Sequence, residues 1–379
     1  MTVKPPFIYG KLAAGADFAD RQDECDRLVT NFLAGTNTII LSPRRWGKSS
    51  LVSKAAGLAT EKDPRLRIIQ MDLFNIRSEA DFYKLLSEKL ITAVSGRMEQ
   101  VAANVREFMR QWVPRISFSP GAQQEVSFEL DWNEVKKEPG AILDMAEEIA
   151  VRKDLQIVIG IDEFQNAGYY EDPLAFQKTL RAAWQKHSHV SYCLYGSKRH
   201  MLMDVFASPS MPFYKFGDLV FLDKIPLEHW GPFIEGRFEA TGKSITRAQA
   251  EHIAVTVDRH PYYVQQLAQI CWLRTHKKVA DSTIDKATEH LALQLSMLFQ
   301  GITEGLTTPQ VNFLRALIDG VEKLSAAQTV REYGLGSSAH IAVVKKALIQ
   351  KEIIDDHGGK IEFLDPVYKI WLNRYFFIR

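Results

Sequence analysis

Short apolar runs alternate with helically spaced segments along the first part of the chain. Runs rich in β-branched and aliphatic residues favour buried strands. They predict strands at 37–42, 67–73, 155–163, 190–197 and 218–222. Spacing typical of helices predicts helices at 49–60, 79–94, 140–152 and 174–187, the second with Ser78 as its N-cap. Strands that alternate with helices predict an α/β fold, a parallel sheet flanked by helices that ends near residue 225.

One stretch within this pattern reads differently. Residues 96–136 contain a helical piece near 100–112. Apolar and polar residues then alternate around the Pro-Gly pair at 120–121. Alternation around a turn of this kind is consistent with a β-hairpin. We interpret residues 96–136 as an insertion into the α/β domain.

The pattern changes after the predicted sheet. Residues 227–300 are helical and contain no convincing strand, and three more helices are predicted at 309–319, 325–333 and 338–351. Two short strands follow around the His-Gly-Gly turn at 357–359. Three helices and a hairpin are a winged-helix arrangement. The predicted domains are an α/β domain at 1–225, a helical lid at 226–304 and a winged helix at 305–379.

Composition narrows the class of protein without identifying a partner. The 379 residues suffice for two or three domains, and 46% hydrophobic with 25% charged residues is ordinary for a globular chain. The net charge of +1 provides no bulk attraction to nucleic acid or to a membrane surface. The three widely spaced cysteines suggest neither a disulfide framework nor a zinc site. With no signal pattern and no membrane-spanning run, we expect a cytoplasmic protein without a membrane partner.

The first candidate functional motif is the stretch SPRRWGKSS at 42–50, which lies between a predicted strand and a predicted helix. It follows the phosphate-loop (P-loop, Walker A) pattern G-x-x-x-x-G-K-[ST], with Ser42 at the first glycine. Gly47 would let the backbone approach the phosphates, Lys48 would reach the β- and γ-phosphates, and Ser49 would bind Mg²⁺. The alternative is a chance Gly-Lys-Ser in a basic loop.

The second element is a hydrophobic strand that ends in Asp162 and Glu163, as in a Walker B motif. Asp162 would hold Mg²⁺, and Glu163 would act as general base on the attacking water. An ordinary acidic strand end is the alternative. Ser197 ends the next strand, where it would position water or sense the phosphate unless it is a simple turn serine. Together the motifs predict nucleoside-triphosphate hydrolysis, since no acceptor site of a kinase is recognisable.

Four segments, GKSS, IVIGIDEFQ, YGS and HPYY, together resemble the archaeal-type ATPases of the STAND class, relatives of the AAA+ and origin-recognition ATPases. Residues 18–24 resemble that family's F-x-x-R-x-x-E box, which implies that Phe18 and Arg21 frame the nucleotide. Residues 259–263 resemble the G-x-P signature of its helical lid, with Arg259 at the glycine. The likeness implies that His260 and Pro261 contact adenine. The family's loop, G-P-R-R-x-G-K-[ST]-S, implies that the following residues contact the nucleotide: Pro43, Arg44, Arg45, Trp46, Gly47, Lys48, Ser49 and Ser50.

The resemblance implies a switch that binds ATP or ADP with Mg²⁺, moves its lid and winged helix with nucleotide state, and self-associates. The alternative is a nucleotide-gated DNA-binding or scaffold protein with little turnover. Residues 307–379 carry ten Lys or Arg and eight Asp or Glu. Lys345, Lys346 and Lys351 lie on the presumed recognition helix, but that helix also has a broad apolar face, and Asp355 and Asp356 accompany Lys360 in the wing. DNA and protein partners therefore both stay open.

Overall fold

In a computed structural model, the chain is described at residues 4–94, 117–120, 126–129, 139–357 and 359–377. It divides into two compact units. One comprises Arg21–Asp223, and the other comprises Met1–Asp20 together with Lys224–Arg379. A further division of the second unit near residue 304 stays a prediction.

The first unit is built on a five-stranded sheet in the order β2-β5-β6-β1-β7. All neighbouring strands in it run parallel, which confirms the predicted α/β class. Because the strands are parallel, their carboxyl ends meet at one edge of the sheet. The strands are β1 (Thr38–Leu41), β2 (Leu66–Asp72), β5 (Gln156–Asp162), β6 (Val190–Gly196) and β7 (Asp218–Phe221).

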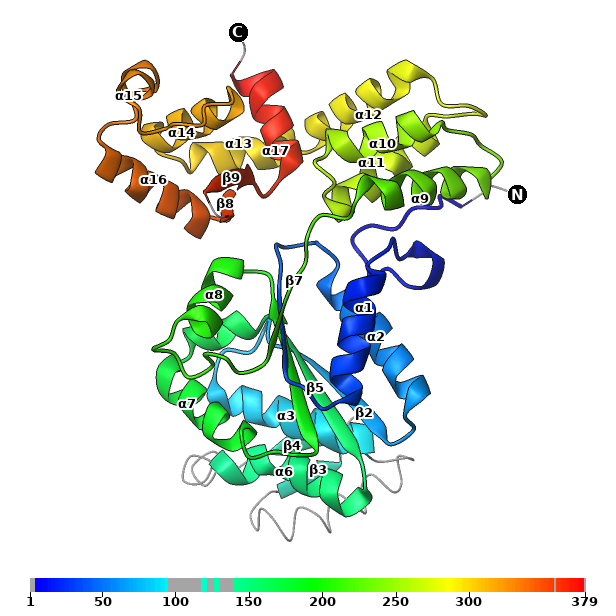
Figure 1. Ribbon diagram of the computed structural model, residues 1–379, viewed down its shortest axis with the longest axis vertical. Coiled ribbons are helices and arrows are strands. Elements are labelled where there is room, and N and C mark those ends of the chain that lie inside the picture. Colours follow the sequence, from blue (N-terminus) through cyan, green and yellow to red (C-terminus); the bar gives the residue numbers. More distant parts are fainter. Residues whose placement is uncertain (1–3, 95–116, 121–125, 130–138, 358, 378–379) are drawn as a thin grey trace. The chain divides into compact units, whose positions relative to one another are not determined.

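Helices cover both faces of this sheet (Figure 1). On one face, α3, α6 and α7 share a continuous buried core with Ile39 and Leu41 of β1 and with the alternate residues Ile157, Ile159 and Ile161 of β5. On the other face, α1 packs against α2. The helices are α1 (Gln22–Leu33), α2 (Lys48–Lys62), α3 (Glu79–Val94), α6 (Pro139–Lys153), α7 (Pro173–Trp184) and α8 (Arg199–Ala207). Neither α1 nor α8 was among the predicted helices.

The predicted hairpin of the 96–136 insertion is confirmed. Strand β3 (Ser117–Pro120) pairs antiparallel with β4 (Val126–Glu129). The helical piece predicted near 100–112 lies outside the described residues.

The second unit is almost entirely helical and has one continuous buried core, which extends from Phe7 and Trp230 to Trp371. The predicted three helices and hairpin are present as α14, α15, α16 and the antiparallel pair β8–β9. None of the described helices of the chain is long and apolar enough to cross a bilayer. The elements of the unit are α9 (Leu227–Glu239), α10 (Arg247–Thr256), α11 (Pro261–Leu273), α12 (Asp281–Gln294), α13 (Ser296–Glu304), α14 (Thr308–Ile318), α15 (Ala327–Tyr333), α16 (Ser338–Gln350), β8 (Ile354–His357), β9 (Lys360–Phe363) and α17 (Pro366–Trp371).

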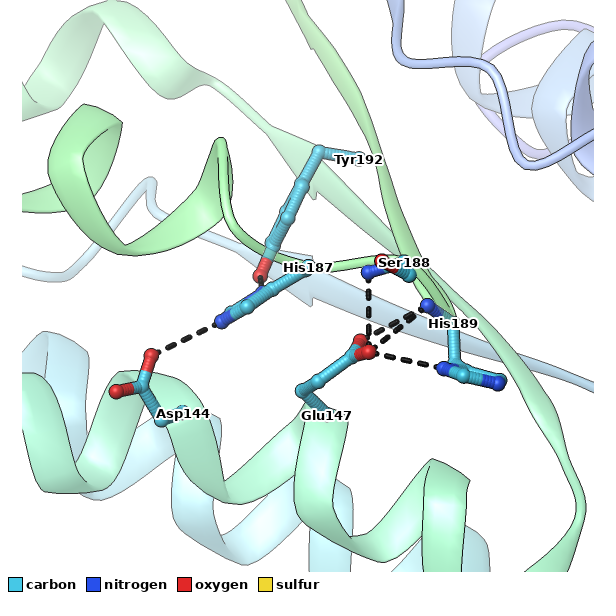
Figure 2. Close-up of polar contacts among 6 residues, drawn as sticks. All are labelled: Asp144, Glu147, His187, Ser188, His189 and Tyr192. Carbon is cyan, nitrogen blue, oxygen red and sulfur yellow. Dashed lines mark hydrogen bonds and ion pairs between the residues drawn. The ribbon is translucent and has the colours of Figure 1, made fainter.

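A polar cluster fastens α6 to the turn that leads into β6 (Figure 2). The Glu147 carboxylate accepts hydrogen bonds from the backbone N–H of Ser188 at 3.0 Å and of His189 at 2.9 Å, and it lies 2.9 Å from His189 Nδ1. One turn earlier, Asp144 Oδ1 lies 3.0 Å from His187 Nε2, whose ring also contacts the Tyr192 hydroxyl. These contacts lie at the amino end of β6 and fix where that strand enters the sheet.

We expect Glu147→Gln to lower the free energy of unfolding by about 1–3 kcal/mol at neutral pH, since it weakens hydrogen bonds to a charged group. Burial alone would raise the pKa of Glu147, but its hydrogen bonds from His189 and Ser188 outweigh burial and lower it. A lowered folded-state pKa contributes stability above the unfolded-state value, and that stability is lost as the pH falls through the folded-state pKa.

Denaturant unfolding at neutral and acidic pH measures this effect. Glu61→Gln, at an exposed position of α2, is the matched control. Equal free energies of unfolding of the two variants at neutral pH would contradict the prediction. It would also be contradicted if the loss of unfolding free energy in Glu147→Gln were the same in acid.

Candidate nucleotide-binding site

The predicted phosphate loop joins β1 to the first turn of α2, which begins at Lys48. Gly47 is the N-cap and has φ +89°, a left-handed conformation that glycine adopts readily. A Cβ at Gly47 would meet no atom within 4 Å, so conformation rather than space requires glycine there. Ser42, which replaces the first glycine, is fully buried, and its Oγ donates to the Pro43 carbonyl at 3.1 Å. The serine thus fits the turn, and the N-terminus of α2 faces the loop, as anion binding requires.

Lys48 is buried beneath this loop, and its ammonium donates to the carbonyls of Pro43 at 3.0 Å and Ser42 at 3.4 Å. Burial lowers the pKa of Lys48 to about 8, and the nearby positive charges of Arg44 and Arg21 act in the same direction. The carboxylates of Asp162 and Glu163 oppose that shift only in part. A polyanion beside this ammonium would favour its charged form and raise its pKa again.

Ser49 and Asp162 meet across the sheet edge. Ser49 Oγ donates to Asp162 Oδ2 at 2.7 Å, and the backbone N–H of Glu163 donates to Asp162 Oδ1 at 2.8 Å. Burial raises the pKa of Asp162, and the charge of Glu163 adds to the shift. A cation would compensate this buried carboxylate. Hydroxyl and carboxylate oxygens fit Mg²⁺, which takes few protein ligands and completes its coordination with phosphate and water.

Glu163 and Ser197 also come together. Glu163 follows β5 in a left-handed conformation, with φ +52°. Its Oε2 accepts hydrogen bonds from Ser197 Oγ at 2.9 Å and from the Gln165 side-chain amide. This contact arises because β6 pairs with both β1 and β5, which places the end of β6 between the loop and the acidic strand end. Gln165 was not among the predicted site residues, although it is the last residue of the IVIGIDEFQ segment, two residues after Glu163.

Arg21, the N-cap residue of α1, contacts the loop. It is buried, and its guanidinium donates to the carbonyl of Trp46 at 3.3 Å and to the carbonyl of Asp223 at 3.0 Å. It also pairs with Glu24 at 2.9 Å. Arg21 therefore holds the phosphate loop through the Trp46 backbone. Trp46 itself is mostly buried, whereas Arg44 and Arg45 are exposed and Ser50 is buried on α2.

The remaining predicted residues, Phe18, His260 and Pro261, belong to the second unit. Pro261 opens α11, and His260 is its buried N-cap residue. Arg259 has φ +56°, so the arginine adopts the left-handed conformation that favours the glycine it replaces. Phe18 follows a short 3₁₀ turn, Gly15–Asp17. The contact of these residues with the nucleotide stays a prediction.

No protein-family model matches the chain, and neither does any curated protein. Among solved structures, a Walker-type ATPase of Pyrococcus abyssi is similar over 95% of this chain and 97% of that one, with a TM-score of 0.63 and 17% identity. The ADP form of the ORC2 protein of Aeropyrum pernix is similar over 96% and 95%, with a TM-score of 0.50 and 12% identity. At such identities the likeness shows the fold alone, and it agrees with the predicted parallel sheet flanked by helices.

Proposed function

We propose that this chain is a Mg²⁺-dependent, ATP-hydrolysing molecular switch of the AAA+/STAND type. The observation that carries the proposal is the convergence of five predicted side chains at the carboxyl edge of three adjacent strands. Lys48 and Ser49 follow β1, Asp162 ends β5 and Glu163 follows it, and Ser197 follows β6, which pairs with both β1 and β5. They arise from three separate sequence motifs, so a chance resemblance in any single motif does not account for the set.

Each side chain has a role that its contacts support. Lys48 and the N–H groups at the start of α2 bind the phosphates. Glu163 accepts a proton from the attacking water, and Ser197 holds Glu163 through the 2.9 Å hydrogen bond to Oε2. Ser49 and Asp162 are the residues that would hold Mg²⁺, which supplies neutralisation of phosphate charge when bound.

The choice of adenine as the nucleobase and the switching movement both rest on the resemblance in sequence. His260 and Pro261, at the start of α11, are proposed to contact adenine. We further propose that nucleotide state moves the helices of 226–304, as a lid, and the winged helix of 305–379, and that the chain self-associates.

Charge pairing in the second unit favours this switch over the DNA-binding alternative. Lys345 on α16 pairs with Asp356 on β8, and Lys360 pairs with Glu362 on β9 at 2.6 Å. Burial alone would raise the pKa of Glu362, but hydrogen bonds from Lys224 and Lys360 lower it to about 2. Lysines that are already paired with carboxylates neutralise fewer DNA phosphates. They therefore release fewer counterions and contribute less to DNA affinity. Filter binding at several salt concentrations, with ADP and with an ATP analogue, tests the alternative, which requires salt-sensitive DNA affinity.

Phosphate release from ATP by the purified chain tests the proposed function. We expect release that needs Mg²⁺ and stops with EDTA. We expect Ser49→Ala to lose most of it, since the variant removes the only hydroxyl that pairs with Asp162 among the described residues. Ser53→Ala, at an exposed position on the same helix, is the matched control and is expected to behave as the wild type. Mg²⁺-independent release, or equal rates in both variants, would overturn the metal assignment.

A further inference from the structure

Gln165 is a buried side chain beside the proposed general base. It lies in the short 3₁₀ helix η2 (Phe164–Tyr169), directly after β5, and is 2% exposed. Its amide nitrogen donates to Glu163 Oε2, the oxygen that also accepts from Ser197. In the described part of the chain, all side-chain hydrogen bonds to the Glu163 carboxylate fall on Oε2. This arrangement leaves Oε1 as the oxygen available to a water molecule.

The end of β6 is shaped around the same carboxamide. A Cβ added to Gly196 would lie 1.8 Å from Gln165 Oε1 and 2.9 Å from its Cδ. Gly196 is not among the residues with positive φ, so its conformation would accept other residues. The Gln165 carboxamide in its present position, rather than backbone conformation, therefore leaves no room for a Cβ at residue 196.

The unbonded end of Gln165 indicates which interaction fixes its orientation. Oε1 is buried and has no hydrogen-bond partner among the described residues. A buried acceptor without a partner is unfavourable, because it has lost its hydrogen bonds to water. An ionised carboxylate can only accept, so the amide must turn its NH₂ group toward Glu163 and its oxygen toward Gly196. The Gln165 carboxamide therefore keeps its hydrogen bond to Glu163 although, in the described part of the chain, this orientation leaves its own Oε1 without a partner.

From these contacts we infer that Gln165 is a positioning residue for the Glu163 carboxylate, and that Gly196 provides the space it needs. The inference rests on the proposed function, because it concerns the geometry of that general base. Gln165 and Ser197 restrain one carboxylate oxygen from two directions, one donor from η2 and one from β6. The two hydrogen bonds then hold the carboxylate in a single orientation.

Gln165→Met tests this role because methionine has a similar length and cannot donate a hydrogen bond. We expect kcat for ATP hydrolysis to fall by about 10²-fold, the scale of a misplaced catalytic group, and KM for ATP to stay unchanged. Gln177→Met is the matched control, because Gln177 on α7 is another buried glutamine whose Oε1 has no hydrogen-bond partner in the described part of the chain. Unchanged kcat in Gln165→Met, or an equal loss in Gln177→Met, would overturn the inference.

A double-mutant cycle tests the role of Gly196. Gly196→Ala should lower kcat as Gln165→Met does, because the new methyl group displaces the carboxamide. In a Gln165→Ala background the clash is gone, so Gly196→Ala should have no further effect. Gly160→Ala is the control on the adjacent strand, where a Cβ would make ordinary contacts at 3.6 Å. A further loss in the double variant would overturn the assigned role of Gly196.

Two measurements separate this inference from the proposed function. Retained Mg²⁺-ATP binding, seen as a thermal shift, shows that a Gln165 variant is folded. If Gln165→Met does not fold, Gln165→Ala replaces it in the test. Wild-type protein that does not hydrolyse ATP would overturn the proposed function and, with it, the inference. If the wild type hydrolyses ATP and Glu163→Gln does not, while Gln165→Met and Gln165→Ala keep full kcat, only the inference is overturned.

Discussion

Glu163→Gln is expected to lower the rate of phosphate release by about 10²–10⁴-fold, the range that general-base catalysis contributes, while ATP still binds. Glutamine has the shape of glutamate, and its side-chain oxygen can accept the hydrogen bond that Ser197 donates to Glu163 Oε2. It cannot take a proton from water, so the chemical step is lost while the phosphate loop stays intact.

Steady-state phosphate release at saturating ATP, together with a direct titration of ATP, measures the two effects separately. Glu171→Gln is the matched control, because Glu171 is an exposed glutamate just beyond η2. Turnover that is unchanged in Glu163→Gln would show that Glu163 is not the base. Turnover and binding lost together would instead point to a structural role of the carboxylate at the end of β5.

Lys48→Met is expected to abolish measurable ATP binding. The ammonium is buried at the start of α2, where backbone N–H groups and the helix terminus also favour an anion. Methionine fills a similar volume without charge, and it removes a buried cation that burial disfavours. We therefore expect the fold to survive, so that thermal unfolding without nucleotide distinguishes lost binding from lost structure.

The lowered pKa of Lys48 gives the wild type a characteristic pH dependence. With a folded-state pKa of about 8, the free protein loses the Lys48 proton as the pH rises above that value. Phosphate binding favours the charged form, so binding above pH 8 takes up a proton, and affinity falls by up to about tenfold per pH unit. Below that pH the lysine is already charged, and this contribution to affinity is constant.

Calorimetric titrations in two buffers of different ionisation heat count the protons taken up. Lys62→Met is the control variant, because Lys62 is exposed at the far end of α2. Binding by Lys48→Met equal to that of Lys62→Met would remove Lys48 from the site. Wild-type affinity that is flat between neutrality and pH 10 would contradict the lowered pKa of its ammonium.

The five sheet strands could be predicted from sequence because each is short and rich in apolar residues and because turns or helical spacing separate them. The position of the predicted phosphate loop between a strand and a helix could be recognised from sequence because it is local. Gly47, Lys48 and Ser49 are consecutive, and their strand and helix flank them directly. The same holds for Asp162 and Glu163 at the end of β5. Where neighbouring residues carry both the conformation and the chemistry, sequence alone is sufficient.

Helices α1 and α8 had no counterpart among the predictions, although both are present in the structure. Only residues 22–24 of α1 belong to a sequence motif, the F-x-x-R-x-x-E resemblance of residues 18–24. Its helix packs against α2, and from its start Arg21 reaches the Trp46 carbonyl. That contact joins residues 25 positions apart, a separation at which no local spacing rule applies.

Sequence alone determined the α/β class, the loop and the acidic strand end, because each rests on residues adjacent in the chain. The tertiary structure decided the strand order, which places Ser197 on Glu163 only because β6 lies between β5 and β1. It also decided the packing of Gln165 against Gly196, two residues 31 positions apart by their numbering. Hydrogen bonds and steric clearance act over a few ångströms of space, and only the folded chain brings such distant residues within that range.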